Sequence, residues 1–430
     1  MTESRTDTIA AISTAPGRGG IAVVRVSGPD AWKVAEKVTG RRIADEDAGR
    51  FRHVGMAGVD EGLMLVFKAP RSYTGEDSVE LQGHGGTVAP RRVLEACLAA
   101  GARLAGRGEF TLRAFLNGRL DLSEAEAVID LVDARTERAA TDAFARLEGA
   151  LSRPFERLYA EAIDLSSRLE HALDVSEDEL PDDFRSDIDS RIAALAREVD
   201  RMAATAHEGR LLREGALVVL AGAPNAGKSS LMNALLETDR TIVDSVAGTT
   251  RDAIEEGLDI AGWPVRLMDT AGLRETEDPV EAEGVNRARA LVAKADIVVA
   301  LDCDIPGALR IHAKCDLDGI NGLDDRNGLE GIHVSAKTGE GLQALRQAIA
   351  SRLEALAARG DEVAEADVTV RQKGFLLGAS AALARAVGAI DCVAAANEVR
   401  TAAECLGKIV GKTYSDDLLE ALFSRFCVGK

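Results

Sequence analysis

The sequence contains no apolar run that approaches the roughly 18–20 residues needed to span a membrane as a helix. Its first seven residues are polar and do not form the pattern of a signal peptide. The 6 cysteines are scattered, and no two of them form a C-x-x-C pair, which disfavours both a disulfide framework and a zinc site. We therefore expect a cytoplasmic protein that does not contact membranes.

A basic surface is also lacking. Lys and Arg number 52 against 71 Asp and Glu, which gives a formal net charge of −19. Nucleic-acid binders usually carry basic stripes that displace counterions from phosphate groups, and no such stripe dominates here. Any contact with RNA is therefore local, or is made mostly by a partner protein. The 430 residues suggest about three domains, and their hydrophobic fraction of 46 % is sufficient for packed cores.

A phosphate-binding loop is present in the middle of the chain. Residues 222–229 read Gly-Ala-Pro-Asn-Ala-Gly-Lys-Ser and match G-x-x-x-x-G-K-[ST] at every fixed position. An apolar run at 216–221 predicts a buried strand before the loop, and residues 229–236 predict a helix after it. In such a loop, backbone N–H groups hold phosphate oxygens, Lys228 reaches the β- and γ-phosphates, and Ser229 holds Mg²⁺. The alternative is a glycine-rich turn before an ordinary helix.

Two further motifs follow in the order expected of a GTPase switch protein. A threonine in Ala-Gly-Thr-Thr-Arg-Asp, residues 247–252, can complete the coordination of Mg²⁺. In Asp-Thr-Ala-Gly, residues 269–272, the aspartate contacts Mg²⁺ and the glycine N–H can sense the γ-phosphate. The next residue, Leu273, cannot orient the attacking water as a glutamine does in many small GTPases. Candidates for that role lie in an acidic run that is otherwise a solvated loop: Glu275, Glu277, Asp278, Glu281 and Glu283.

The base-recognition motif departs from the usual N-K-x-D. The chain has Ala313-Lys314-Cys315-Asp316, so Asp316 can still accept hydrogen bonds from guanine while the asparagine is missing. Residues 335–337, Ser-Ala-Lys, follow a predicted strand and can place a backbone N–H against guanine O6. Only about a dozen residues separate the buried strand at 295–301 from Ala313, too few for a crossover helix with its turns. We expect guanine specificity, with weakened binding, in a trimmed domain.

The segments on either side predict two further domains. Residues 1–118 alternate short strands with helices at 30–39 and 88–100, as in a small α/β domain. Residues 119–214 predict long amphipathic helices, the first of which starts at a capping box of Ser123 and Glu126 and reaches Leu147. Their apolar stripes are interpreted as core. Helices without proline return within 357–430, after a nucleotide domain at 215–356, so we expect one helical domain in two segments with the nucleotide domain inserted.

Together these features resemble the tRNA wobble-uridine modification GTPases of the MnmE family, also called TrmE. Further marks of the resemblance lie along nearly the whole chain, at residues 16–20, 74–77, 81–86, 108–111, 114–117 and 426–430. The resemblance implies a multidomain fold that combines α/β and all-α parts. These are an N-terminal α/β folate-binding domain, a split helical-bundle domain and an inserted P-loop (Ras-like) G domain. It also implies a homodimer formed through the N-terminal domain.

The resemblance implies work with a flavoprotein partner of the MnmG (GidA) type, in a heterotetramer. Such pairs add an aminomethyl or carboxymethylaminomethyl group to C5 of the wobble uridine, position 34, of certain tRNAs. The carbon comes from 5,10-methylenetetrahydrofolate, of which 5-formyltetrahydrofolate is an analogue, and the partner brings FAD and NADH. The partner can carry much of the tRNA contact, which agrees with the net charge of −19.

The resemblance also assigns the nucleotide site. Implied GTP contacts are Asn225, Ala226, Gly227, Lys228, Ser229, Ser230, Asp244, Ser245, Val246, Ala247, Gly248, Thr249, Thr250, Asp269, Thr270, Ala271, Gly272, Asp316, Ser335, Ala336 and Lys337. Mg²⁺ falls to Ser229 and Thr250. When G domains pair across the dimer, K⁺ replaces an arginine finger, with Asn225, Asp244, Val246 and Thr249 as its implied ligands. Glu281 matches the glutamate that orients the attacking water, beside Lys228 as a catalytic residue.

Folate contacts implied by the resemblance fall on Arg25, Glu80, Arg119 and Lys430. A carboxylate such as Glu80 can accept two hydrogen bonds from the pterin edge, and cationic side chains suit the glutamate tail of folate. The alternative for Glu80 is an ordinary carboxylate on the surface of a sheet. Cys427 belongs to a C-terminal motif near the folate pocket and is either catalytic or an ordinary buried cysteine.

Two other functions remain open at this point. A GTPase switch could regulate RNA or ribosome assembly without one-carbon chemistry, although such proteins usually carry a basic domain or tail. A folate-dependent aminomethyl-transfer enzyme with a vestigial G domain would account for Ala313 and the short 302–312 segment. GTP turnover with and without K⁺ distinguishes a vestigial G domain from an active one. Titration with 5-formyltetrahydrofolate distinguishes a pure GTPase switch, which should not bind it, from the folate-dependent enzymes.

Overall fold

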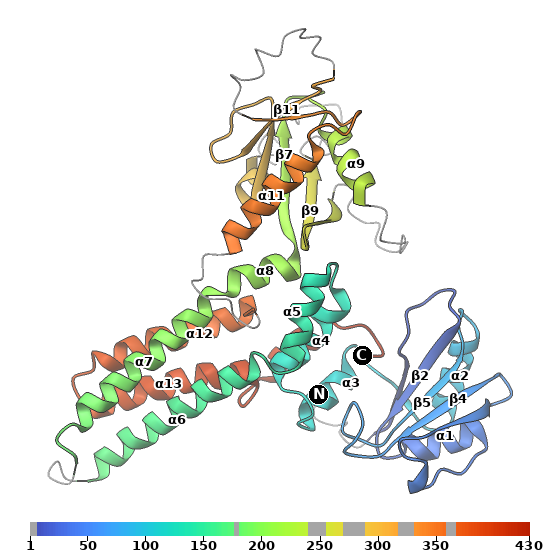
Figure 1. The fold of residues 1–430 in the computed structure, drawn as a ribbon. Coiled ribbons are helices and arrows are strands. Elements are labelled where there is room, and N and C mark those ends of the chain that lie inside the picture. Colours follow the sequence, from blue (N-terminus) through green and yellow to red (C-terminus); the bar gives the residue numbers. More distant parts are fainter. Residues whose placement is uncertain (1–6, 176–179, 240–254, 270–288, 317–330, 358–366) are drawn as a thin grey trace, which may run out of the picture. The chain divides into compact units, whose positions relative to one another are not determined.

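The computed structural model describes residues 7–175, 180–239, 255–269, 289–316, 331–357 and 367–430 (Figure 1). The chain divides into two compact units, of which the first comprises residues 1–129, 147–164 and 400–430. The second comprises residues 130–146 and 165–399. Within the described residues, every helix is too short or too polar to cross a membrane.

The first unit is built on a six-stranded sheet in the order β3-β4-β5-β2-β1-β6. Its strands are β1 (Ile9–Ile12), β2 (Ile21–Ser27), β3 (Phe51–Met56), β4 (Asp60–Phe67), β5 (Ser78–His84) and β6 (Arg103–Leu104). Neighbouring strands are antiparallel except for β1 and β6. Helices α1 (Ala31–Thr39) and α2 (Ala89–Ala99) pack against the sheet and share a core with Val24, Met64 and Leu81. The strands and helices predicted up to residue 100 are confirmed.

The opposite face of this sheet carries apolar side chains that remain exposed. Side chains alternate between the two faces of a strand, so Ile21, Phe51 and Leu63 point away from the helix-covered core. They are 66 %, 70 % and 37 % exposed. Arg25 and Glu80 lie on the same open face, by the same alternation.

The first unit also contains helices from distant parts of the chain. They are α3 (Glu109–Leu116), most of α4 (Leu122–Asp133), the start of α6 (Ser152–Asp174), the end of α13 (Cys392–Val410) and α14 (Asp416–Phe423). Phe115, Leu122, Leu419 and Phe423 form a core between α3, α4 and α14. Helical segments before and after the nucleotide domain therefore share one hydrophobic cluster.

The capping box predicted at Ser123 and Glu126 is wrong by two residues. Asp121 Oδ1 accepts a hydrogen bond from Glu124 N at 2.8 Å, and Glu124 Oε2 accepts one from Asp121 N at 2.9 Å. Ser123 is buried inside the helix instead. The pattern [ST]-x-x-[DE] was matched two residues too late because aspartate caps helices as well as serine does.

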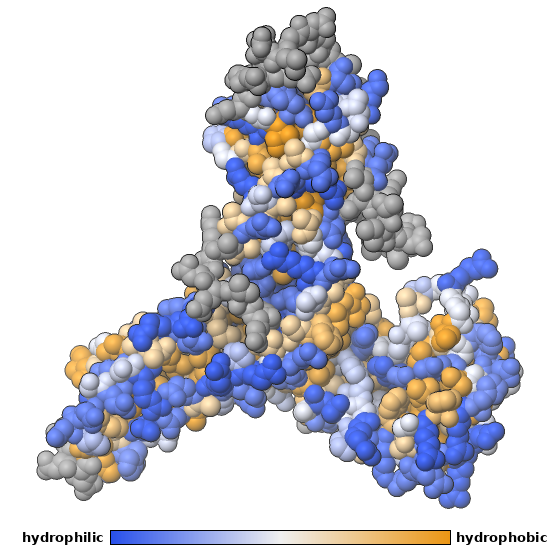
Figure 2. Space-filling view, in the orientation of Figure 1, coloured by the Kyte–Doolittle hydropathy of each residue, from blue (hydrophilic) through white to orange (hydrophobic). Residues whose placement is uncertain are grey.

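The helical part of the second unit consists of α5 (Glu137–Leu147), α7 (Phe184–Ala204), α8 (Ala206–Glu214), α12 (Val370–Val387) and parts of α6 and α13. The expectation of one helix reaching Leu147 is wrong, because α4 ends at Asp133 before α5 begins. Ile188, Ile192 and Val199 of α7 are buried as predicted. Exposed apolar residues lie on these helices and between them, such as Leu377 on α12 and Ile390 in the connection from α12 to α13, and Figure 2 shows apolar areas between hydrophilic ones.

The nucleotide domain of the second unit is a six-stranded sheet in the order β12-β11-β10-β7-β9-β8. Its elements are β7 (Ala216–Gly222), α9 (Lys228–Asp239), β8 (Glu255–Ile260), β9 (Trp263–Asp269), β10 (Ile297–Leu301), β11 (Leu309–Ala313), β12 (Ile332–Val334) and α11 (Leu342–Ala357). All neighbouring strands are parallel except β8 and β9. Residues of α9 and α11 share one hydrophobic core with the sheet.

The connection between β10 and β11 contains no helix. The two strands are parallel neighbours, with Val299 opposite Leu309, and residues 302–308 join them. Asp302 adopts φ +49° and donates a backbone hydrogen bond to the Ile311 carbonyl at 3.0 Å, which turns the chain back at once. The predicted absence of a crossover helix is therefore confirmed.

Candidate active site

The phosphate-binding loop connects β7 to α9 at the carboxyl end of the sheet (Figure 1). A Cβ added to Gly222 would lie 2.8 Å from the Leu301 carbonyl oxygen, so β10 leaves room only for glycine there. Gly227 has φ +100° and Asn225 has φ +62°, both in the left-handed region. These turns carry the chain into the N-terminus of α9, where N–H groups and the helix dipole favour an anion.

Lys228 and Ser229 begin α9 and lie where the motif requires them. Lys228 Nζ donates to the carbonyl oxygens of Gly222 and Ala223, at 3.0 and 2.8 Å, and the residue is 5 % exposed. These acceptors are neutral, so a phosphate would attract the ammonium group more strongly.

Ser229 and Asp269 meet across the sheet. The parallel register places Leu220 of β7 opposite Asp269 at the end of β9. Ser229 Oγ donates to Asp269 Oδ2 at 2.6 Å. Hydroxyl and carboxylate oxygens are hard ligands of the kind that Mg²⁺ prefers, so this pair fits the ion.

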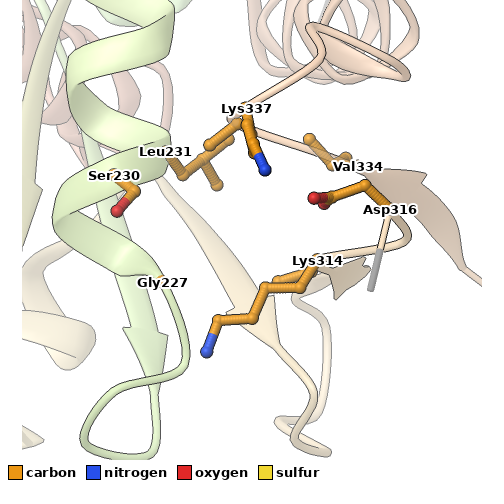
Figure 3. Close-up of a pocket in the computed structure, with 9 residues that line it drawn as sticks. Gly227, Ser230, Leu231, Lys314, Asp316, Val334 and Lys337 are labelled. Atoms are coloured by element: carbon orange, nitrogen blue, oxygen red, sulfur yellow. The ribbon is translucent and has the colours of Figure 1, made fainter. Parts of the chain in front are cut away.

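A pocket of about 330 Å³ adjoins the loop (Figure 3). It is lined by Gly227, Ser230, Leu231, Ala313, Lys314, Asp316, Val334, Ala336 and Lys337. Figure 3 shows Lys314 and Lys337 on opposite sides of the space, with the Asp316 carboxylate pointing into it. Apolar walls with one carboxylate suit a purine whose N–H groups need an acceptor.

Asp316 is oriented by the segment that follows β12. Ser335 Oγ donates to Asp316 Oδ1 at 2.7 Å and accepts from Thr338 N at 3.2 Å. Ser335 is fully buried, and its hydrogen bond to the exposed Asp316 is partly buried. The motif at 335–337 therefore fixes the carboxylate that is expected to read the base.

The structure gathers those residues predicted to contact GTP that lie in its described ranges at one edge of the sheet, at the carboxyl ends of β7, β9, β11 and β12. These are Asn225, Ala226, Gly227, Lys228, Ser229, Ser230, Asp269, Asp316, Ser335, Ala336 and Lys337. The other predicted residues lie outside the described ranges: Asp244, Ser245, Val246, Ala247, Gly248, Thr249, Thr250, Thr270, Ala271, Gly272 and Glu281.

A second polar cluster lies in the first unit. Arg25 on β2 faces Glu80 on β5, and its Nε and Nη2 both donate to Glu80 Oε1, at 3.0 and 2.9 Å. The Arg25 guanidinium lies 5.0 Å from the ring centroid of Tyr73 and 5.6 Å from that of Phe110. Sequence reasoning missed both aromatic residues, although Phe110 belongs to a motif that it quoted.

Lys430 and Arg119 reach the same cluster. The Lys430 carbonyl accepts from Phe110 N at 3.2 Å, and partial burial together with the Arg25 charge lowers the pKa of the Lys430 amine. Arg119 Nε donates to the Ser72 carbonyl at 3.2 Å, beside Tyr73. Contacts therefore link all four predicted folate residues to this cluster: Arg25 lies at both rings, Glu80 binds Arg25, Lys430 binds the Phe110 backbone, and Arg119 binds the residue before Tyr73.

Cys427 is exposed, and its carbonyl accepts from Gly108 N at 3.3 Å. The expectation of an ordinary buried cysteine is therefore wrong, whereas a catalytic role for the thiol stays a prediction.

Asn117 and Arg113 support this cluster rather than line it. Asn117 Nδ2 donates to the Thr74 carbonyl at 2.7 Å, which ties α3 to the loop before β5. Arg113 is 6 % exposed and pairs with Asp7, Glu76 and Glu109. A buried guanidinium needs such partners, because an unpaired buried charge is costly.

Comparison with known proteins finds matches along nearly the whole chain. A family model described as the MnmE helical domain matches residues 122–427, and one described as the GTP-binding protein TrmE N-terminus matches residues 8–119. The tRNA modification GTPase MnmE of Symbiobacterium thermophilum is 43 % identical over 461 residues, covering 99 % of each chain. Those of Laribacter hongkongensis and Alkalilimnicola ehrlichii are 43 % identical over 454 residues and 44 % identical over 447 residues, covering at least 98 % of each chain.

These alignments are longer than the 430-residue chain, so the chain lacks residues that these relatives have. Among solved structures, the G domain of the T. maritima FeoB iron transporter is 25 % identical, with a TM-score of 0.23. That match covers 32 % of this chain and 98 % of the other, a likeness too weak to support an inference. The family model over 122–427 and the full-length relatives show that this chain belongs to the MnmE family of tRNA modification GTPases.

Proposed function

We propose that this chain hydrolyses GTP and acts with an MnmG/GidA-type flavoprotein on C5 of the wobble uridine, position 34, of certain tRNAs. The group added is aminomethyl or carboxymethylaminomethyl, and its carbon comes from 5,10-methylenetetrahydrofolate. The observation that carries the proposal is that one chain holds both a phosphate loop with an Mg²⁺-ready pair and a separate cluster in which Arg25 and Lys430 lie near the Glu80 carboxylate. Neither a simple switch nor a simple folate enzyme needs both.

GTP hydrolysis is assigned to the phosphate loop and its neighbours. Lys228 would hold the β- and γ-phosphates, while Ser229 with Thr250 would hold Mg²⁺ and Asp269 would contact it. When bound, Mg²⁺ neutralises charge on the phosphate oxygens. Glu281 is proposed to orient the attacking water.

A K⁺ site beside the phosphate loop is proposed at Asn225, Asp244, Val246 and Thr249, completed when two G domains pair. The Asn225 side chain is exposed and forms no hydrogen bond with the described residues, so its amide oxygen is available as a ligand. Neutral amide oxygens of this kind are suitable ligands for K⁺.

Folate binding is assigned to the cluster around Tyr73 and Phe110. Glu80 would accept hydrogen bonds from the pterin edge, while Arg25, Arg119 and Lys430 provide cations for the glutamate tail. The partly exposed Tyr73 ring offers a flat surface for a conjugated ligand, while Phe110 is fully buried beneath the Arg25 guanidinium. The exposed thiol of Cys427 is available to a ligand in this region and is proposed to take part in the chemistry.

We propose that two copies associate through the first unit. The exposed Ile21, Phe51 and Leu63 on one sheet face are the kind of apolar surface that an interface covers. Because the net charge is −19, the flavoprotein partner, which also brings FAD and NADH in a heterotetramer, would make most of the tRNA contact. The domain limits 1–118, 119–214, 215–356 and 357–430 and a cytoplasmic location are part of the same proposal.

The test combines chemistry and cells. Mass spectrometry of wobble nucleosides from cells lacking the chain should show loss of the modified uridines. Purified protein should turn over GTP faster in K⁺ than in Na⁺ and should bind 5-formyltetrahydrofolate. Unchanged nucleosides together with no folate binding would favour a GTPase switch of RNA or ribosome assembly. Normal folate binding without turnover in either salt would favour a vestigial G domain.

A further inference from the structure

Two residues with unusual backbone conformations are bonded to each other at the nucleotide site. Asn225 in the phosphate loop has φ +62°, and Lys314 after β11 has φ +61°. Residues other than glycine rarely adopt such positive φ values, and they keep them only when the surrounding structure holds them there. Lys314 Nζ donates to the Asn225 backbone carbonyl at 2.7 Å.

Lys314 therefore belongs to two sites. It lines the base pocket, where Figure 3 shows its side chain extending toward the phosphate loop. A Cβ added to Gly227 would lie 3.6 Å from Lys314 Cε, so the lysine stem runs close along the loop. Ala313, its neighbour in the pocket, carries only a methyl group and cannot add a polar side-chain link.

Of the residues proposed to bind K⁺, only Asn225 lies in the described part of the chain, and it is proposed to bind through its side chain. Its carboxamide forms no hydrogen bond with the described part of the chain, so nothing there fixes the amide except its own backbone. That backbone is held through the carbonyl on which Lys314 Nζ lies. Movement of Lys314 would therefore release the peptide that carries the amide.

We propose that Lys314 is a positioning residue for the monovalent-cation site. By fixing the Asn225 carbonyl, it presents the Asn225 amide oxygen to K⁺, so a base in the pocket and K⁺ beside the phosphates favour each other's binding. This inference rests on the proposed K⁺ dependence. Coupling of two sites through one shared residue is reciprocal, so K⁺ also strengthens nucleotide binding.

The experiment compares Lys314→Met with Lys337→Met in the full-length protein. Both variants remove an ammonium group from the same pocket and keep an unbranched side chain, but no bond links Lys337 to Asn225 among the described residues. The first readout is the K⁺ concentration that gives half-maximal GTP turnover. The second, independent of turnover, is the rise in melting temperature of the complex with GDP and aluminium fluoride as K⁺ replaces Na⁺.

We expect Lys314→Met to raise the half-maximal K⁺ concentration at least about fivefold in both readouts, within the usual range of coupling between sites. Lys337→Met should weaken GDP binding and leave the K⁺ concentration within about twofold of the wild type. Melting in Na⁺ without nucleotide shows whether each variant is folded. Lys314→Arg, which keeps a donor, should recover part of the K⁺ response.

Three results would overturn the proposal. Lys314→Met could have the same half-maximal K⁺ concentration as the wild type while binding GDP more weakly. Lys314 would then contribute to binding the base only. Both methionine variants could shift the K⁺ response equally, which would make the effect a general one of the pocket. A wild-type protein that shows no K⁺ response in either readout would remove the proposed cation site, and this inference with it.

Discussion

The guanidinium of Arg138 lies over the indole ring of Trp263, with 3.9 Å between its central carbon and the ring centroid. Arg138 is in α5, and it also pairs with Glu208 of α8. Trp263 is fully buried at the start of β9, the strand that ends at Asp269 in the proposed Mg²⁺ site. Within the second unit, α5 therefore contacts the start of β9, the end of this strand that is remote from the proposed nucleotide site.

Replacing Arg138 by Ala should destabilise this contact. Loss of a partly desolvated cation–π pair and an ion pair predicts a decrease of about 1–2 kcal/mol in the free energy of unfolding. Urea unfolding followed by tryptophan fluorescence measures it, in a Trp32→Phe background that leaves Trp263 as the reporter. Arg135→Ala, which changes an exposed arginine three residues earlier in the connection between α4 and α5, is the control and should change stability little. Equal effects of the two variants would show that the indole contact adds nothing.

Asp367 should make the stability of the second unit depend on pH. Burial, followed by the charges of Glu208 and Asp142, raises the pKa of its carboxyl from 3.8 to about 7, while Arg213 and Arg146 oppose the shift. Because the folded state holds this proton more tightly than the unfolded state, the stability that it contributes is present below about pH 4. That contribution is lost as the pH rises to about 7.

Asp367→Asn replaces the carboxyl with an amide that does not titrate, so this contribution to the pH dependence of stability is lost. At pH 8 the variant should be more stable than the wild type by about 2–4 kcal/mol, and at pH 4 the two should be alike. Urea unfolding at several pH values tests this. The prediction is wrong if the difference between the two proteins stays constant from pH 4 to pH 8.

Asp316→Asn should change which base is bound. The carboxylate held by Ser335 accepts from the guanine N–H groups, whereas an amide presents a donor to the carbonyl of xanthine. GDP binding should weaken at least about a hundredfold, and binding of the xanthosine nucleotide should strengthen. Competition against a fluorescent nucleotide measures both. Ser335→Ala is the control: it should weaken both nucleotides without reversing their order.

Ala313→Asn should strengthen guanine binding. The methyl group of Ala313 lines the pocket and provides no donor for a ring nitrogen. One added hydrogen bond predicts a gain of about five- to tenfold in GDP affinity. Ala313→Leu, of similar size but without a donor, should not reproduce the gain. The gain should also vanish with 7-deaza-GDP, which lacks the acceptor at N7, and its persistence there would contradict the proposed contact.

Local patterns predicted the parts of the molecule that depend on neighbours in sequence. The phosphate loop, the buried strand before it and the missing helix between β10 and β11 are of this kind, because loop geometry and connection length follow from consecutive residues. The contacts between Lys314 and Asn225 and between Arg138 and Trp263 join positions far apart in the chain. No periodicity reports such pairs, since tertiary packing alone brings them together. The break between α4 and α5 was missed because apolar spacing continues across it.

Lys430 should make folate binding depend on pH in a way that an ordinary lysine does not. Burial and the neighbouring Arg25 charge lower the pKa of its amine from 10.5, so its positive charge is lost at a lower pH than in solution. If that charge holds the glutamate tail of folate, the affinity for 5-formyltetrahydrofolate should fall as the pH rises toward this lowered pKa. Isothermal titration between pH 7 and pH 10 measures the fall. Lys430→Arg keeps its charge over this range and should abolish most of the fall in affinity. If the variant shows the same pH profile as the wild type, Lys430 does not bind the glutamate tail.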